Sequence, residues 1–500
     1  MFLQDKIRRV RCHYCLNRKE GIMKKTTIKS LLLLLVILAL NQNIVISAPY
    51  GAQWYDVSEY LLGKVYVKVF FVESDEKSPN TENWTEEEKT NCKEALGKAL
   101  AQVRKRFVQE FEIEPKTGKL PPGVNLDFII DYEIVEVSVE PIKLSGSGIM
   151  FSTGDLKIWI NEIMAKKGFN KKNPPPGPQP IRPYPPYQYN VAEYADYLRN
   201  THGTDWAIVI FFIDNSNDED GKFADGKNAY HPMGIGGPGL LFFNNRGKRF
   251  PERQKVPEDP FSSIGIIHEF LHVWYAIDEH PYNKHFREDA VIGYLGGENA
   301  NFNMAKGIKC SMNSANLYWP ELCTYTKKQI GWTDSNGNHI PDILDVKPVV
   351  TLFTNNKLGN TYKGKAVSPP LPNRNPYSEG GTIKPPHDLS VVLHLAPVPE
   401  KNLGIKDLYK KVPAFNPPFP WTRNDITINT IISVEYRVLQ DGRAMTDWIK
   451  ADPKDGAFDK AVKDFTFTIK PLGPGTYAIE VRAMNSVHLY SDVVRIQVNQ

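Results

Sequence analysis

Residues 268–272 read His-Glu-Phe-Leu-His, and they constrain the fold of this chain more than any other segment. Isoleucines before them and apolar residues within them predict a buried helix over about 262–274. His268 and His272 lie one helical turn apart, so both imidazoles leave one face and can bind one zinc ion. Glu269 can then act as a general base toward a water at that metal. An exposed helix with two solvated histidines would show the same spacing, but the apolar context argues against it.

Asp278 lies ten residues after His268 and is the first candidate for a third ligand. At ~100° and ~1.5 Å per residue, a straight helix would carry Asp278 away from the histidine face. The chain must therefore leave the helix near residue 275 and fold back for Asp278 to reach the metal. The alternative ligands are His280, Glu288 and Asp289.

This pattern resembles that of the metzincin metallopeptidases, HExxHxxGxxH, in which Asp is the last ligand in some branches. The residues that fall on it are His268, Glu269, His272 and Asp278. Residues 276–280 resemble the ending of secreted bacterial or archaeal members. Tyr275 departs from the pattern, because it stands where glycine makes the reversal. A tyrosine with positive φ costs ~1 kcal/mol or more, so another turn is an alternative, and the third ligand stays open between Asp278 and His280.

Residues 310–313, Cys-Ser-Met-Asn, resemble the methionine-containing turn of the same family. The resemblance implies that Met312 packs beneath the imidazoles without binding the metal. Cys323 follows Cys310 by thirteen positions, and a disulfide between them would stabilise this turn by about 3 kcal/mol. An ordinary core methionine and two free thiols are the alternative. Cys92 lies on an apolar helical stripe, which favours a core position over a metal-blocking thiol.

The resemblance covers about residues 60–335 and implies a zinc metalloendopeptidase that hydrolyses proteins or peptides. It also implies that 236–244 forms the edge strand that pairs with an extended substrate. The substrate-binding residues would be Gly237, Leu240, Leu241 and Phe242. An internal hairpin is the alternative for this segment. Two other functions stay open: a catalytically silent zinc-containing surface-binding protein, and a zinc amidase that acts on cell-wall material.

The N-terminus predicts export. A basic start at Met23, an apolar stretch over 31–40 and small residues before Pro49 are typical of a secretory signal peptide. Ten apolar residues are too few to span a bilayer, which requires ~20, so we expect no stable membrane span. Residues 1–48 are therefore a leader whose true start is Met23, and the Cys12-x-x-Cys15 pair before it is not expected to bind metal.

The charge balance excludes nucleic acid as an expected partner. Residues 1–48 contain nine Lys and Arg against two Asp and Glu, so the +4 of the whole chain becomes −3 without them. Three cysteines remain after residue 48, too few for a disulfide framework.

We expect an α+β domain over 49–333, with a mixed twisted sheet and long helices. The predicted elements are strands over 64–72, about 125–134 and 206–213 and a long helix from Thr85, whose side chain and Glu88 form a capping box. Their order matches that of a metzincin before its HExxH helix. The proline- and tyrosine-rich residues 173–189 predict an extended surface loop.

Residues 334–345 place oxygen-bearing side chains at calcium-loop spacing. The candidate calcium ligands are Asp334, Asn336, Asn338, Asp342 and Asp345. His339 stands where glycine is usual, and a solvated polar linker is the alternative. The acidic residues 214–225 are a second, less regular candidate.

Residues 346–500 contain short alternating strands separated by Pro and Gly turns, the clearest at 433–438, 476–482 and 493–498. They predict an immunoglobulin- or fibronectin-III-like β-sandwich. This domain carries no catalytic motif, and we expect it to contact a cell surface, matrix or substrate.

Overall fold

The computed structural model describes residues 48–75, 77, 83–141, 156–178, 186–214, 229–230, 240–244, 263–279, 291–298, 309–313, 321–353, 360–374 and 424–499. These residues all belong to one compact unit, Ser47–Gln500. Several predictions concern other residues and stay predictions: the signal peptide and start at Met23, the acidic residues after Asp214, Gly237, and the ligand candidates His280, Glu288 and Asp289.

A five-stranded sheet organises the first domain. Its order is β2-β1-β3-β5-β4, and every neighbouring pair is parallel except β5 and β4, which are antiparallel. The strands are β1 (Gly63–Ser74), β2 (Leu126–Val137), β3 (Trp206–Ile213), β4 (Ala229–Tyr230) and β5 (Leu240–Asn244). The three strands predicted first, β1, β2 and β3, are confirmed.

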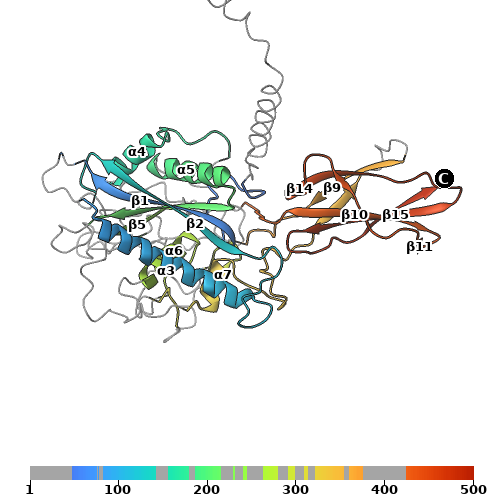
Figure 1. Cartoon of the computed structure of the whole chain (residues 1–500), viewed down its shortest axis with the longest axis horizontal. Helices are drawn as coiled ribbons and strands as arrows, with labels where there is room; N and C mark the ends of the chain where they lie inside the picture. Colours follow the sequence, from blue (N-terminus) through green and yellow to red (C-terminus); the bar gives the residue numbers. More distant parts are fainter. Residues whose placement is uncertain are drawn as a thin grey trace, which may run out of the picture. The chain divides into compact units, whose positions relative to one another are not determined.

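Helices cover both faces of this sheet (Figure 1). The long helix α3 (Glu86–Phe111) and the later helix α6 (Ser263–Val273) pack on one face, and α4 (Leu156–Lys166) and α5 (Pro186–His202) pack on the other. Helix α3 begins where the sequence predicts, because Thr85 and Glu88 form the reciprocal capping box. Helix α5 was not predicted, and its first residues lie inside the expected loop 173–189, which is wrong from Pro186 onward.

Strand β1 shows why both faces are buried. Val65, Val67 and Val69 join the core beneath α3 and α6, whereas Tyr66 and Phe70 join the core beneath α4 and α5. A strand covered on both sides has no polar face, which explains the nearly continuous apolar run in its sequence.

The segment expected to form the substrate-binding edge strand includes β5, and its role in binding substrate stays a prediction. Strand β5 lies inside the sheet: Leu240–Asn244 pair with β3, and Phe242 and Phe243 also pair with Tyr230 and Ala229 of β4. The backbone of Phe242 is therefore engaged on both sides and is not open to a substrate strand. Among the described residues, Leu240 and Leu241 pair with β3 alone.

The C-terminal region is all-β, with two antiparallel sheets around a shared core. One sheet has the order β11-β10-β15-β16, with β12 also on β10, and the other has the order β13-β14-β9-β8. The strands are β8 (Val349–Leu352), β9 (Thr361–Val367), β10 (Ile431–Gln440), β11 (Arg443–Ala444), β12 (Ile449–Lys450), β13 (Asp452–Pro453), β14 (Val462–Thr468), β15 (Thr476–Asn485) and β16 (Val494–Asn499). The α+β class and the all-β C-terminal region are therefore confirmed.

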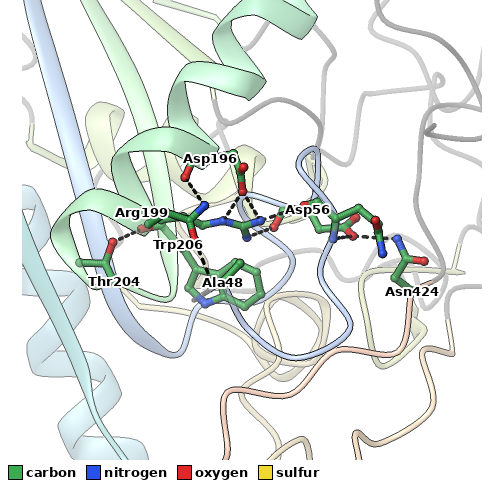
Figure 2. A network of polar contacts seen from close by, with 9 residues as sticks. Ala48, Asp56, Asp196, Arg199, Thr204, Trp206 and Asn424 are labelled. Atoms are coloured by element: carbon green, nitrogen blue, oxygen red, sulfur yellow. Dashed lines mark hydrogen bonds and ion pairs between the residues drawn. The ribbon is translucent and has the colours of Figure 1, made fainter. Parts of the chain in front are cut away.

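A polar network around Arg199 joins the start of the described chain to α5 (Figure 2). The Arg199 side chain is fully buried and donates to Asp196 Oδ1 and to the backbone carbonyls of Gln53 and Asp56. Asn424 Nδ2 in turn donates to Asp56 Oδ2 at 2.7 Å. Residues distant in sequence thus meet at one buried cation.

Among the described helices, none is long and apolar enough to cross a membrane.

Candidate metal centre

Helix α6 carries the two histidines of the motif. Ile267, Phe270 and Leu271 bury its apolar face in the core shared with α3. His268 and His272 point from neighbouring turns, with ring centroids 4.8 Å apart and only 7% and 5% of each residue exposed. Both imidazoles therefore lie inside the protein, which is unlike the exposed helix that the spacing alone also allows.

The chain leaves α6 through a left-handed residue at Tyr275, whose φ is 70°. Ala276 N–H donates to Leu271 O at 3.1 Å, and Tyr275 N–H donates to His272 O at 3.1 Å. These two bonds form a Schellman motif, the usual way to end a helix with a left-handed residue. The Tyr275 hydroxyl donates to Glu59 Oε1 at 3.1 Å. The reversal is thus made at the position where the metzincin pattern has glycine, but here by a tyrosine that is buried and whose hydroxyl bonds to Glu59.

This reversal brings Asp278 to the histidines. Asp278 Oδ1 lies 3.0 Å from His268 Nε2 and 3.6 Å from His272 Nε2. Asp278 is only 1% exposed, and one ligand atom from each of the three residues lies within 4.8 Å of the others. Two imidazole nitrogens and a carboxylate oxygen are a donor set that suits zinc.

Backbone carbonyls orient both imidazoles. His268 Nδ1 donates to Ser311 O and His272 Nδ1 donates to Ala276 O, each at 2.8 Å. A carbonyl can only accept, so each Nδ1 carries the proton and each Nε2 faces Asp278 with its lone pair in the neutral ring. Such a second hydrogen bond is typical of metal-binding histidines.

The two histidines differ in their pKa. Burial lowers the pKa of both rings, but for His268 the hydrogen bond and charge of Asp278 outweigh burial and raise the pKa to about 9. For His272 burial prevails, and its pKa lies below the ordinary value. Without metal, His268 therefore carries the proton that Asp278 attracts, and a cation that binds here must displace it.

The turn 310–313 contacts the centre through two of its backbone carbonyls. Asn313 N–H donates to Cys310 O at 2.9 Å and closes the turn, and Met312 is fully buried. Ser311 holds His268, as described above, and Met312 O accepts the Glu279 N–H at 2.9 Å. The turn thus fixes one ligand and the residue next to another, and sequence reasoning missed these carbonyl contacts because carbonyls leave no mark in a side-chain pattern.

Cys310 and Cys323 are neighbours, as the predicted disulfide requires, but both are free thiols in the structure. Cys323 N–H lies 3.4 Å from Cys310 Sγ. Cys92 lies on α3, forms no disulfide and is buried in the core, as the apolar stripe predicts. Glu279, which sequence reasoning did not assign, lies between Asp278 and these two thiols.

The residues proposed for calcium are brought together in part. Asp345 Oδ2 accepts the side-chain amides of Asn336 at 2.7 Å and Asn338 at 3.1 Å. Asp334 Oδ2 accepts the backbone N–H of His339 at 2.7 Å, and its Oδ1 accepts those of the two preceding residues. The carboxylate of Asp342 is bonded to Thr333 and Ser335 instead. Of the residues proposed for substrate, Leu240, Leu241 and Phe242 lie on β5, inside the sheet.

No protein-family model matches this chain, and no curated protein matches it. One matching solved structure is described as "Structure of Astrotactin-2, a conserved vertebrate-specific and perforin-like membrane protein involved in neuronal development". It is 12% identical, with a TM-score of 0.17, over 33% of this chain and 24% of that chain. The chain thus spans about a quarter of that structure's length. A likeness this low carries no argument, so function must be argued from the site.

Proposed function

We propose that this protein is a secreted zinc-dependent endopeptidase with a metzincin-like catalytic domain. One observation carries the proposal: His268, His272 and Asp278 converge within 4.8 Å, and Glu269 lies on the same helix between the two histidines. The element order before α6 and the turn 310–313 agree with the resemblance. The signal-peptide-like leader supports export.

The residues of this chain would divide the work of hydrolysis. His268 and His272 would hold zinc through Nε2, and Asp278 through its carboxylate. When bound, zinc supplies a Lewis acid that polarises a peptide carbonyl and lowers the pKa of water. Glu269 is partly exposed, so its carboxylate can meet a water from solvent. It would take a proton from that water as the oxygen attacks the scissile carbonyl and pass the proton to the leaving amine nitrogen.

Replacing the base while keeping the ligands tests this function. We expect Glu269→Gln to lower kcat on a casein-like protein by about 10²-fold or more, because an amide cannot accept the proton. Zinc content should stay at the wild-type level, since His268, His272 and Asp278 are retained. Glu87→Gln, at an exposed position in the first turn of α3, is the matched control and should keep full activity.

The same assay separates the other functions. If the wild-type protein binds zinc but turns over no substrate, and Glu269→Gln behaves in the same way, the protein is a silent binding protein. Release of fragments from peptidoglycan with casein left intact would identify a cell-wall amidase instead. Casein cleavage by the wild type and by Glu87→Gln, together with its loss in Glu269→Gln, supports the endopeptidase.

A further inference from the structure

A second cluster of ligand atoms lies beside the first and has no part in the mechanism above. A carboxylate oxygen of Glu279 and the sulfurs of Cys310 and Cys323 lie within 4.8 Å of one another. We propose that these three side chains form a second metal site, which takes a divalent cation of the zinc class through two thiolates and one carboxylate. Glu279 is 3% exposed and Cys310 is 0% exposed, whereas Cys323 is half-buried, so the site is largely interior.

The contacts of Glu279 bring its carboxyl group and the two thiols into one hydrogen-bonded cluster. Cys323 Sγ lies 3.1 Å from each carboxylate oxygen of Glu279, and the Thr326 hydroxyl donates to Glu279 Oε1 at 3.0 Å. The same hydroxyl lies 3.2 Å from Cys310 Sγ. Three acidic groups thus face one another in the interior, and a buried carboxylate is costly unless it is paired or binds a metal.

A disulfide explains only part of this arrangement. Bonding Cys310 to Cys323 would remove both S–H groups and leave the buried Glu279 carboxyl with the Thr326 hydroxyl alone. A divalent cation engages all three groups at once. The cluster therefore has the composition of a metal site. A disulfide would use the two cysteines and leave the carboxyl group of Glu279 without a role.

The dimensions and the ligand types suit zinc. Zn–S bonds of ~2.3 Å in a tetrahedron hold two sulfurs roughly 3.8 Å apart, so ligand atoms within 4.8 Å need only a small approach. Thiolates select zinc-like metals over calcium or magnesium.

Such a site would join three segments that support the first centre. Glu279 follows Asp278 directly, Cys310 begins the turn whose Ser311 carbonyl holds His268, and Cys323 caps the short helix α7 (Thr324–Gln329). A metal bound here would fix these segments to one another. We therefore assign the second site a positioning role, because it acts on the first centre only through backbone connections.

Cobalt substitution tests the proposal, because Co²⁺ bound to thiolate absorbs in the near-ultraviolet by charge transfer and Co²⁺ bound to His268, His272 and Asp278 does not. The protein is the full chain with Cys12 and Cys15 replaced by serine, so that the leader offers no thiolate. It is reduced, freed of metal and titrated with Co²⁺ alone. We expect two Co²⁺ per chain and the charge-transfer band.

Variants assign the band to its ligands. Cys323→Ser should remove the band and leave one Co²⁺ per chain, and His272→Gln should lose a Co²⁺ and keep the band. Glu279→Gln keeps both thiols. We expect it to weaken the Co²⁺ affinity, measured from the growth of the charge-transfer band, at least tenfold, and it tests the site even if a cysteine variant does not fold. Cys92→Ser is the matched control and should match the parent protein.

Two results would overturn the proposal. One is a single Co²⁺ per chain without the band in the reduced, folded parent. The other is a parent protein that, after mild reduction, is still two hydrogens lighter than its fully reduced mass, because Cys310 and Cys323 are joined as a disulfide, and that binds no second Co²⁺. Either result leaves the peptidase proposal standing, because casein cleavage and its loss in Glu269→Gln are measured independently.

Discussion

At the scale of single residues, Tyr275 shows how an unfavourable backbone conformation is retained. Its φ of 70° costs about 1 kcal/mol or more relative to glycine. The ring is 3% exposed, and the hydroxyl bonds to Glu59, so packing and a hydrogen bond offset the strain. The position of Asp278 depends on this turn, so the strained backbone at Tyr275 brings Asp278 to the candidate metal centre.

We expect Tyr275→Phe to be more stable than Tyr275→Gly. The metzincin pattern, which has glycine at this position, would alone suggest the opposite order. Tyr275→Phe loses the bond to Glu59, and we expect it to lower the free energy of unfolding by about 1 kcal/mol. Tyr275→Gly relieves the backbone but removes a buried ring, which costs about 3–5 kcal/mol, so it should be the less stable protein. Urea unfolding at neutral pH measures both. A glycine variant as stable as wild type would show that the ring contributes nothing to the reversal.

The sequence contained part of the centre, and chain reversal supplied the rest. His268, Glu269 and His272 follow from helical spacing alone. The choice of Asp278 requires the turn at Tyr275, which propensity disfavours and tertiary packing imposes. Glu279 was missed because its partners, Cys310 and Cys323, lie more than thirty residues away, and no periodicity records such a meeting.

At the scale of elements, the sequence predicted those helices and strands that depend on interactions between residues close in the chain. The capping box at Thr85 and the apolar run of β3 each specify one element, and both are confirmed. The placement of β5 depends instead on which strands flank it, and a one-strand sequence pattern cannot distinguish an edge strand from a neighbour of the edge. That is why the sequence did not show that Phe242 pairs with a strand on each side.

A buried cation on β1 stabilises the pairing of β1 with β2. Lys68 is 5% exposed and lies 2.5 Å from Asp131 Oδ2 and 2.8 Å from Glu133 Oε2. Burial raises the pKa of both carboxyls, but the hydrogen bonds and charges of Lys68, and of Lys167 at Glu133, outweigh it and lower both values. Depressed carboxyl pKa values stabilise the fold above about pH 4, and this contribution is lost as pH falls through them.

Lys68→Met should therefore change both stability and its pH dependence. We expect the free energy of unfolding at neutral pH to fall by about 1–2 kcal/mol, a modest loss because both carboxylates are partly exposed. The decline in stability from about pH 5 to about pH 3 should become shallower, since the two pKa values return toward ordinary ones. Urea unfolding across this range is the measurement, and Lys64→Met, exposed on the same strand, is the control. An unchanged acid slope would exclude Lys68 as the cause.

At the scale of the whole molecule, close backbone contacts join the α+β domain to the β-sandwich. A Cβ on Gly51 would lie 2.0 Å from Asp425 O, and one on Gly123 would lie 2.3 Å from Ser486 O. Tyr50 also pairs with Thr427 as an antiparallel bridge. The two regions are thus connected at several points besides the chain itself.

The loop 334–345 lies at this junction and is the proposed calcium site. Residues of the sandwich side bind its end: Asn429 Nδ2 donates to Leu344 O at 2.8 Å, and Asn485 Nδ2 donates to Val346 O at 3.0 Å. Asp345 and Asp334 at present accept hydrogen bonds from the loop's own amides. A cation would replace those donors with a charge that binds both carboxylates, and it would order the junction as a whole.

Calcium should therefore raise the Tm of the whole protein and not that of one region. We expect a rise of several degrees in excess Ca²⁺, reversed by a calcium-selective chelator without loss of zinc, because ligand binding to the folded state stabilises it by mass action. Asp345→Asn should abolish the rise, since it removes a carboxylate that two loop amides contact, and Asp447→Asn, at an exposed sandwich position, should keep it. Differential scanning calorimetry separates the cases. A wild-type Tm that ignores calcium would mean that hydrogen bonds among its own residues suffice to hold this loop.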